Sequence, residues 1–347
     1  MKNYVNGFCE SDQMNSIIST KAIIRTKKHK KPLEATRIIC RFYHGEMPYW
    51  NNFIKYHKSL GAEEFLVFVQ SKEDKRWIEN NTKIREINIQ IIYDQQTSQA
   101  HHDEVAKNAN PKLFRTDHHN KLQLLIDIDE YFAQHRSDVT PEKVTRMHSP
   151  DVHQIFIPSI LSLRLNDERA FSELKGIWGH VGRPIAETKF IDKIENAHSF
   201  KVSQGQPLPA GMFGLSIIHL WTRSFNDCLI KIFSRTKQDI KSPGREASLL
   251  DLKQGELPHR LRLLAYLNLQ DFYLGLSSRT NVQPRFDKEE EYLSQFLSYE
   301  NQLKCRLLYE EYKLRLKTIF YSLPTYPAAN FPTIRKKLPS LEELRAN

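Results

Sequence analysis

Short apolar runs alternate with amphipathic stretches between residues 36 and 126, and this alternation limits the folds open to the chain. Helical spacing of apolar residues marks residues 47–60 and 74–81, with Gly61 as a terminator and Asp74 as an N-cap. The apolar runs between them are rich in β-branched and aromatic residues, as strands are. They lie at residues 37–43, 64–69, 87–93 and 122–126. Strand–helix alternation of this kind predicts an α/β fold with a mainly parallel central sheet.

The character of the sequence changes twice along the chain. Residues 1–35 form a polar and then basic extension, residues 36–235 carry the alternation together with a His-rich helical stretch at 100–121, and residues 236–347 are expected to be helical. In this last region, residues 287–323 show a stripe of apolar side chains at helical spacing, which we expect to face the core. The stripe consists of Tyr292, Leu293, Phe296, Leu297, Leu303, Leu307, Leu308 and Tyr312.

The charge balance favours anionic partners but does not choose among them. Lys and Arg number 51 against 41 Asp and Glu, so the formal net charge is +10. Nucleic acid, a phospholipid surface and phosphorylated small molecules all fit this balance. The four cysteines are far apart and the N-terminus lacks an apolar segment, so we expect a cytoplasmic protein. The basic run at residues 27–31 suggests a possible peripheral contact with the inner membrane face.

Two aspartates directly follow the last of the apolar runs. Asp127 and Asp129 lie at the carboxyl end of residues 122–126, where ligands bind in α/β sheets. Two carboxylates in this arrangement suit one Mn²⁺ or Mg²⁺ ion, which would neutralise a diphosphate as it leaves. The alternative is a chance D-x-D pattern. Because unpaired carboxylates are costly beside an apolar strand, their position still needs a reason.

Six segments in order along residues 36–235 carry a family resemblance. Residues 125–132 read L-I-D-I-D-E-Y-F, and residues 46–61 read E-M-P-Y-W-N-N-F-I-K-Y-H-K-S-L-G. The other four segments are residues 64–74, 178–182 (W-G-H-V-G), 188–198 and 219–231 (H-L-W-T-R-S-F-N-D-C-L-I-K). Together they resemble a glycosyltransferase family 2-like group with a D-x-D-E-F signature, related to glycosyltransferase family 92. The resemblance implies a GT-A fold, a nucleotide-diphosphate sugar donor (most simply a UDP-sugar), a divalent metal and transfer with inversion to a glycan or glycolipid acceptor.

The resemblance also suggests roles for individual residues. Asp129 and Asp127 are the expected metal ligands, and His219 is either a third ligand or a buried histidine at a strand end. Trp178 would stack on an acceptor sugar or pack in the core, and the general base is open among candidates that include Asp192 and His198. Donor and phosphate contacts are expected from Glu46, Asp74, Asp127, Arg223 and Lys231.

Two departures from the family pattern keep other functions open. Gly45 replaces the usual Asn before Glu46, and Val69-Gln70 replaces an Asp-Asn pair, so the missing carboxylate could be supplied by Asp74. These changes are compatible with a non-catalytic relative that keeps the fold as a scaffold. A nucleic-acid-binding protein is suggested only by the net charge, and without a recognised motif we expect no nucleic-acid partner.

Overall fold

The computed structural model describes residues 31–34, 36–84, 86–93, 122–147, 153–161, 177–178, 182–196, 198–203, 207–209, 214–220, 223–234, 250–273, 288–322 and 338–346. Lys31–Asn347 form one compact unit. Nearly all of the predicted basic extension, the helical stretch at 100–121 and the boundary at residue 235 fall outside the described ranges.

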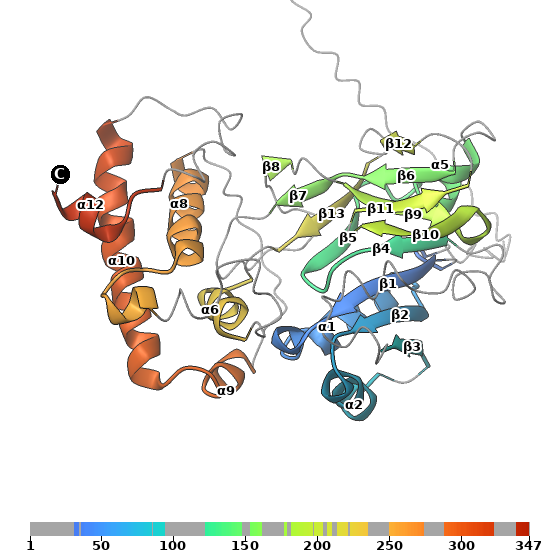
Figure 1. The fold of residues 1–347 in the computed structure, drawn as a ribbon. Helices are drawn as coiled ribbons and strands as arrows, with labels where there is room; N and C mark the ends of the chain where they lie inside the picture. The colour runs from blue at the N-terminus through green and yellow to red at the C-terminus, as the bar shows by residue number, and fades with distance from the viewer. Residues whose placement is uncertain are drawn as a thin grey trace, which may run out of the picture. The chain divides into compact units, whose positions relative to one another are not determined.

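A mixed seven-stranded sheet with helices on it makes the chain an α/β protein, as the alternation predicts (Figure 1). Four strands at one side run parallel in the order β3-β2-β1-β4. The next strand, β9, is antiparallel to both of its neighbours, and β6 and β12 complete the sheet. The strands are β1 (Thr36–Phe42), β2 (Glu64–Val69), β3 (Asn88–Ile92), β4 (Leu122–Leu125), β6 (Gln154–Ile157), β9 (Arg183–Glu187) and β12 (Pro207–Pro209).

Both faces of the central strands are covered, which explains their continuous apolar runs. In β1, Ile38 and Cys40 join the main core together with Phe53 of helix α1 (Trp50–Ser59). Ile39, between them, points to the other face and packs with Phe200. Phe200 belongs to the hairpin of β10 (Ile191–Asn196) and β11 (Ser199–Val202). Each aliphatic side chain buried in this way contributes roughly 1.5–3 kcal/mol relative to exposure.

The chain that leaves β4 enters a second sheet of four strands. These strands lie in the order β5-β13-β7-β8. Strand β13 is antiparallel to β5 and parallel to β7, while β8 pairs with β7 at the edge. The strands are β5 (Glu130–Gln134), β7 (Ser159–Leu161), β8 (Ile177–Trp178) and β13 (Leu215–His219). The turn from β4 to β5 thus connects the two sheets, and Asp127 and Asp129 lie in it.

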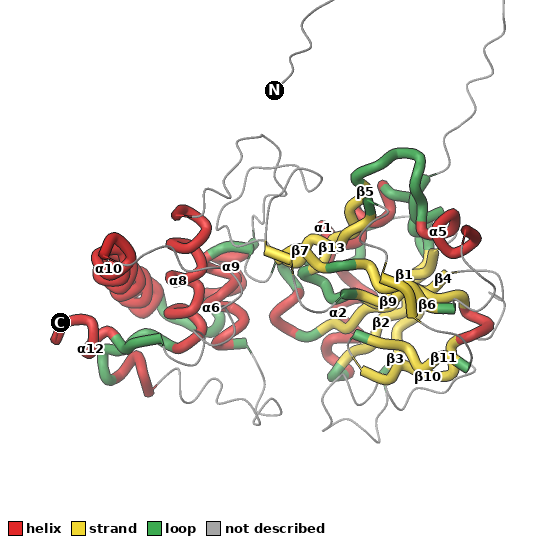
Figure 2. The backbone as a smooth tube through the Cα atoms, turned by 90° about the horizontal axis from the view of Figure 1, so that it is seen from above, coloured by secondary structure: helices red, strands yellow, loops and turns green. Residues whose placement is uncertain are grey.

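Helices account for the regular elements described after β13, and they lie side by side (Figure 2). Helix α6 packs against α8 and α9, and α10 packs against α8 and α12. The helices are α6 (Phe225–Phe233), α8 (His259–Tyr273), α9 (Glu289–Leu293), α10 (Tyr299–Ser322) and α12 (Leu341–Ala346). No helix in the described ranges is long and apolar enough to cross a membrane.

Three local expectations need correction. Asp74 does not cap its helix: α2 (Lys72–Asn81) begins two residues earlier, and Ser71 is the cap that accepts the Asp74 N–H at 2.9 Å. The predicted helix at 287–323 is two helices, α9 and α10, separated by a turn. Its apolar stripe is only partly core-facing, because Leu303 and Leu307 are 45% and 62% exposed.

Candidate functional site

Asp127 is held between two arginines that come from the strands on either side of β4. In the parallel pairing of β1 with β4, Ile39 lies beside Leu125, so continuing the register by two residues brings Arg41 beside Asp127. Strand β9 runs the opposite way and begins at Arg183, next to the end of β4. The distance from Nε of Arg41 to Oδ1 of Asp127 is 2.9 Å, and that from Nη2 of Arg183 to Oδ2 is 2.5 Å. The sheet register itself therefore builds this ion triplet.

Asp129 pairs with a lysine and a histidine from more distant parts of the chain. The Nζ of Lys231 on α6 donates to Oδ2 of Asp129 at 2.9 Å. His219 lies opposite Glu130 in the pairing of β13 with β5. Its Nε2 is 3.5 Å from Oδ2 of Asp129, and its Nδ1 is 3.5 Å from Oε1 of Glu130.

A second arginine-centred group adjoins the lysine. The Nη2 of Arg223 donates to Glu46 at 2.7 Å, and its Nη1 lies 3.3 Å from Asp227. The guanidinium also lies over the Tyr49 ring, 3.7 Å from its centroid. Asp227 is 3.3 Å from Nζ of Lys231, one helical turn along α6, so this group is continuous with Asp129.

These residues form one network, which we call the charged cluster. It joins five acidic side chains to five basic ones. They are Glu46, Asp127, Asp129, Glu130, Asp227, Arg41, Arg183, His219, Arg223 and Lys231. Most are almost wholly buried, but the side chains of Asp127, His219 and Asp129 are 26%, 24% and 13% exposed. A ligand would therefore reach the cluster at the two aspartates and the histidine.

Burial and ion pairing act in opposite directions on the cluster. Burial tends to raise the pKa of Asp127, but Arg41 and Arg183 outweigh it and the pKa is lowered. The pKa of Asp129 is likewise well below its usual value, because Lys231 and His219 outweigh burial. For Glu130 burial dominates despite Arg183, and the pKa is raised. The two aspartates are therefore the members of the D-x-D-E segment kept ionised.

Burial lowers the pKa of His219, but Asp129 and Glu130 overcome this effect and the net shift is upward. The imidazole thus tends to carry a proton next to two carboxylates. A divalent cation would replace that proton, because a metal-bound imidazole must be neutral.

The donor chemistry at the exposed edge fits a divalent cation. Asp129 and His219 already lie within 3.5 Å of each other, and Asp127 is the most exposed carboxylate of the cluster. Among the described residues, no group of three His, Cys, Asp or Glu side chains is arranged to hold a metal as it stands. An ion that takes one or two protein carboxylates and completes its shell with phosphate oxygens and water needs no such group.

No family model matches this chain, and no curated protein matches it either. A function for the charged cluster must therefore be argued from the geometry of the cluster itself.

Several predicted site residues lie together and others do not. Glu46, Arg223 and Lys231 join the aspartates and His219 in the cluster. Asp74 is buried elsewhere, with its Oδ1 3.6 Å from Nδ1 of His44, in the short helix η1 (His44–Glu46).

The three residues expected to act on the acceptor, His198, Asp192 and Trp178, also lie in different parts of the structure. His198 is half-buried, and burial together with the charge of Arg183 lowers its pKa to about 4. Asp192 lies in β10, and Trp178 lies in β8 at the edge of the second sheet. Arg183, whose charge lowers the pKa of His198, belongs to the charged cluster, so the charges of the cluster act on His198.

Four cluster members were given no role by sequence reasoning. Glu130 stands in the D-x-D-E segment itself, and that position was the available signal. Arg41 stands inside a predicted strand, and a charge within an apolar run is a signal that could have been used. Asp227 lies four residues before Lys231 in a helical segment, a spacing that predicts contact. Arg183 carries no such signal, because only the antiparallel pairing of β9 brings it to Asp127.

The departure at Gly45 has a packing reason. A Cβ at this position would lie 2.7 Å from Cε2 of Tyr43 and would overlap Oγ of Ser234, which is buried after α6. The asparagine of the family pattern therefore has no room here as the chain is folded. The adjoining Glu46 is held by Arg223 instead.

Proposed function

We propose that this chain is a metal-dependent glycosyltransferase that uses a nucleotide-diphosphate sugar, most simply a UDP-sugar. One observation carries the proposal. Residues from two other segments of the family resemblance, including Glu46 and Arg223 at 177 residues apart, converge with the two aspartates in one buried cluster. Chance matches scattered along a sequence would have no reason to meet in space.

The location of the cluster supports the finer proposal of a GT-A fold. Asp127 follows β4 at the carboxyl end of the parallel strands β1, β2 and β4. Ligands of α/β sheets bind at this edge. The acidic turn then leads into β5 of the second sheet, so donor and acceptor could meet between groups supplied by both sheets.

Transfer requires that the bond between the anomeric carbon and the diphosphate breaks while an acceptor hydroxyl of a glycan or glycolipid attacks, with inversion. A bound Mn²⁺ or Mg²⁺ would supply Lewis-acid stabilisation of the departing diphosphate. Asp129 with His219, or Asp127 as the most exposed carboxylate, would hold it, and phosphate oxygens and water would complete its shell. Arg41, Arg183 and Lys231 place fixed positive charge beside them, where negative charge grows on the leaving group.

The acceptor hydroxyl must lose a proton as it attacks. His198 is neutral at pH 7 because its pKa is lowered to about 4, which makes it a weak base for this proton. Asp192 remains the alternative base.

Nucleotide binding gives the direct test. We expect UDP to raise the melting temperature of the full chain when Mn²⁺ is present and to lose this effect with EDTA, because ligands that bind only the folded state stabilise it. Metal-dependent hydrolysis of a UDP-sugar should accompany the shift. Equal melting temperatures with and without every common nucleoside diphosphate, in Mn²⁺ and in Mg²⁺, would contradict the proposal.

One observation favours a second candidate, a non-catalytic scaffold with the same fold. Each carboxylate of the charged cluster already has a cationic partner in the protein, so the charges balance without a ligand. Calorimetry with UDP and Mn²⁺ separates the two functions, since a purely structural cluster would give no metal-linked heat of binding.

A further inference from the structure

Helix α10 has one apolar face that the protein covers and a second that it leaves exposed. The covered face packs against α8 and α12 and carries Cys305, Tyr309, Tyr312 and Leu316. On this face the hydroxyl of Tyr309 accepts a hydrogen bond from Asn268 of α8 at 3.1 Å. A surface helix of a globular protein needs only one apolar stripe, so the second face requires its own explanation.

The exposed face follows the repeat of a two-stranded coiled coil. Six positions are separated by three and four residues in strict alternation. They are Glu300, Leu303, Leu307, Glu310, Leu314 and Lys317, and we call them the seam. At 3.6 residues per turn, the seam lies on the side of the helix roughly opposite the covered face. Its three leucines are 45%, 62% and 66% exposed.

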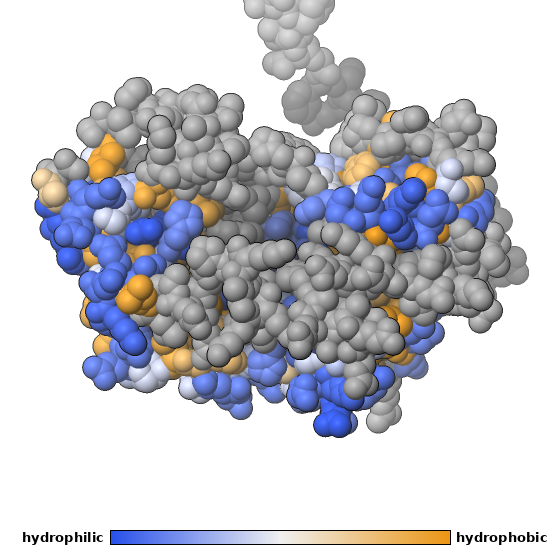
Figure 3. Space-filling view, in the orientation of Figure 1, coloured by the Kyte–Doolittle hydropathy of each residue, from blue (hydrophilic) through white to orange (hydrophobic). Residues whose placement is uncertain are grey.

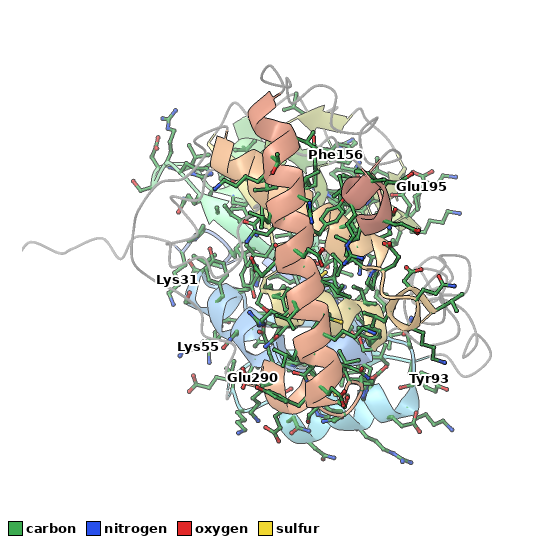
Figure 4. The ribbon with its side chains drawn as sticks, turned by 90° about the vertical axis from the view of Figure 1, so that its left-hand side faces the viewer. Lys31, Lys55, Tyr93, Phe156, Glu195 and Glu290 are labelled. Atoms are coloured by element: carbon green, nitrogen blue, oxygen red, sulfur yellow. The ribbon has the colours of Figure 1, made fainter. Side chains whose placement is uncertain are left out.

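The seam forms a continuous strip along the helix. In Figure 4, α10 is the long helix that faces the viewer, and Figure 3 shows apolar residues among hydrophilic ones over the helical region. Single exposed leucines are ordinary at a protein surface, but three on one strip leave apolar area that burial against a partner would remove from water. From Glu300 to Lys317 the seam is about 26 Å long at 1.5 Å per residue, which suits another helix as the partner.

The charges in the seam favour a partner that carries the same seam in the opposite direction. Glu300 stands near one end of the seam and Lys317 at the other. In an antiparallel pair of α10 helices, related by a two-fold axis at the middle of the seam, Glu300 lies opposite Lys317 of the second copy. In the same pairing Leu303 lies opposite Leu314, so apolar residues and opposite charges are matched together.

Other pairings of the two seams match less well. A parallel pair places each residue opposite itself, so glutamate would face glutamate and lysine would face lysine. An antiparallel pair shifted by one heptad places either Glu300 opposite Glu310 or Leu307 opposite Lys317. In the unshifted antiparallel pair Leu307 meets Glu310, whose carboxylate is already paired with Lys313 of its own chain at 3.2 Å.

The charged side chains that flank the seam are held within the chain. Their contacts are Arg306 over the Phe225 ring at 4.7 Å from its centroid, Lys313 with Glu310 at 3.2 Å, Lys304 with the Leu252 carbonyl at 2.9 Å and Glu311 with Arg345 at 2.8 Å. In the antiparallel pair Lys304 would face Glu311, an attraction, and Arg306 would face Lys313, a repulsion. These two effects oppose each other, so the seam decides the pairing rather than its flanks.

We infer that α10 pairs antiparallel with α10 of a second copy of this chain through the seam. The interface is isologous, so each contact between Leu303 and Leu314, and between Glu300 and Lys317, occurs twice. A single helix pair of this length buries less than the roughly 1,200–2,000 Å² of a standard interface, so we expect dissociation in the micromolar range. The net charge of +10 opposes association, and salt at about 0.15 M screens that repulsion beyond about 8 Å.

Sedimentation equilibrium of the full chain in such salt tests the inference. It needs no nucleotide or metal, so its outcome is separate from the proposed transferase activity. The wild type should pass from monomer to dimer as its concentration rises through the micromolar range. The variant L303Q/L307Q/L314Q should associate roughly tenfold more weakly or worse. These side chains are exposed, so the variant should melt like the wild type.

Charge reversal tests the antiparallel register. Glu300→Lys and Lys317→Glu should each weaken the dimer roughly fivefold, because each turns two attractions into repulsions. The double variant E300K/K317E should recover the wild-type affinity. Lys317→Glu lowers the net charge of the chain, so repulsion by net charge alone predicts tighter association instead. As matched controls, Glu63→Lys and Lys55→Glu change exposed charges before β2 and on α1 and should leave the dimer unchanged.

Several outcomes would overturn the inference. They are a wild type that stays monomeric throughout, a leucine variant that still dimerises, and a double charge reversal that does not restore what the single reversals lose. A monomeric wild type that binds phospholipid vesicles through the three leucines would assign the seam to a membrane instead. If the leucine variant unfolds, the charge reversals and their controls decide the question.

Discussion

Lys231 donates a hydrogen bond of 2.9 Å from its Nζ to Oδ2 of Asp129, a residue 102 positions earlier in the chain. The lysine belongs to α6, and Ser224 caps this helix by accepting the Asp227 N–H at 2.9 Å. The placement of one capped helix therefore sets the charge beside the acidic turn. A substitution of Lys231 should therefore remove positive charge from beside Asp129.

Lys231→Met tests this link. The substitution keeps most of the side-chain volume but leaves Asp129 with His219 as its remaining cationic partner in the cluster. Loss of one member of a buried pair typically costs about 3–5 kcal/mol, and we expect a decrease of that order in the free energy of unfolding. Urea denaturation at pH 7 measures it. As a control, Lys313→Met breaks a pair with Glu310 at the surface and should cost under about 1 kcal/mol. Equal effects would contradict the buried-pair account.

Asp127→Asn should show a pH-dependent loss of stability. The pKa of Asp127 is lowered in the folded chain by Arg41 and Arg183 against the effect of burial, so its ionised form stabilises the fold. This contribution is present above the unfolded pKa of about 3.9 and is lost as pH falls below it. We therefore expect the variant to be less stable than the wild type by roughly 3 kcal/mol at pH 7. The difference should shrink toward pH 3, and an unchanged difference would mean that the charge is not what matters.

Glu289→Gln should have the opposite pH dependence. Burial raises the pKa of Glu289 to about 7, and its carboxylate accepts the Ser224 hydroxyl at 2.6 Å. Because the folded pKa exceeds the unfolded value, wild-type stability is fully present near pH 4 and is lost as pH rises toward 7. The glutamine variant cannot ionise, so it should match the wild type near pH 4.5 and exceed it at pH 8 by roughly 2–3 kcal/mol. Thermal melts across this range measure the difference. The neighbouring exposed Glu290→Gln should leave the wild-type profile unchanged.

Asp129→Asn should abolish metal-linked nucleotide binding if the proposed function holds. The amide keeps the shape of the side chain but is a poor ligand for Mn²⁺, and it leaves Lys231 with Asp227 as its remaining carboxylate partner in the cluster. We expect the Mn²⁺-dependent rise in melting temperature with UDP to disappear. Asp138→Asn removes an exposed carboxylate paired with Arg136 and should keep the full shift. An unaltered shift in Asp129→Asn would place any metal elsewhere.

The sequence predicts the strands more accurately than it predicts the partners of the site residues. Residues 64–69 are β2 without adjustment, and Gly61 ends α1 with a φ of +103°, because apolar periodicity and glycine conformation are local properties. The ion partners of Asp127 are not local. They come from the register of β1 and β9, which no single segment encodes.

Helical periodicity fails for a different reason. It shows that Leu303 and Leu307 share a face with each other, but not whether the chain covers that face.

Gly45→Asn introduces the asparagine of the pattern that the sequence resembles, and we expect it to destabilise the protein. A Cβ at position 45 would lie 2.7 Å from Cε2 of Tyr43 and overlap Oγ of Ser234, so both side chains would have to shift. Overpacking of this kind costs about 1–3 kcal/mol. Combining the change with Ser234→Gly should recover part of the loss, and a double-mutant cycle in urea would show the coupling. If Gly45→Asn were as stable as the wild type, packing would not explain the departure, and the asparagine could be tested as a nucleotide contact in the UDP melting assay.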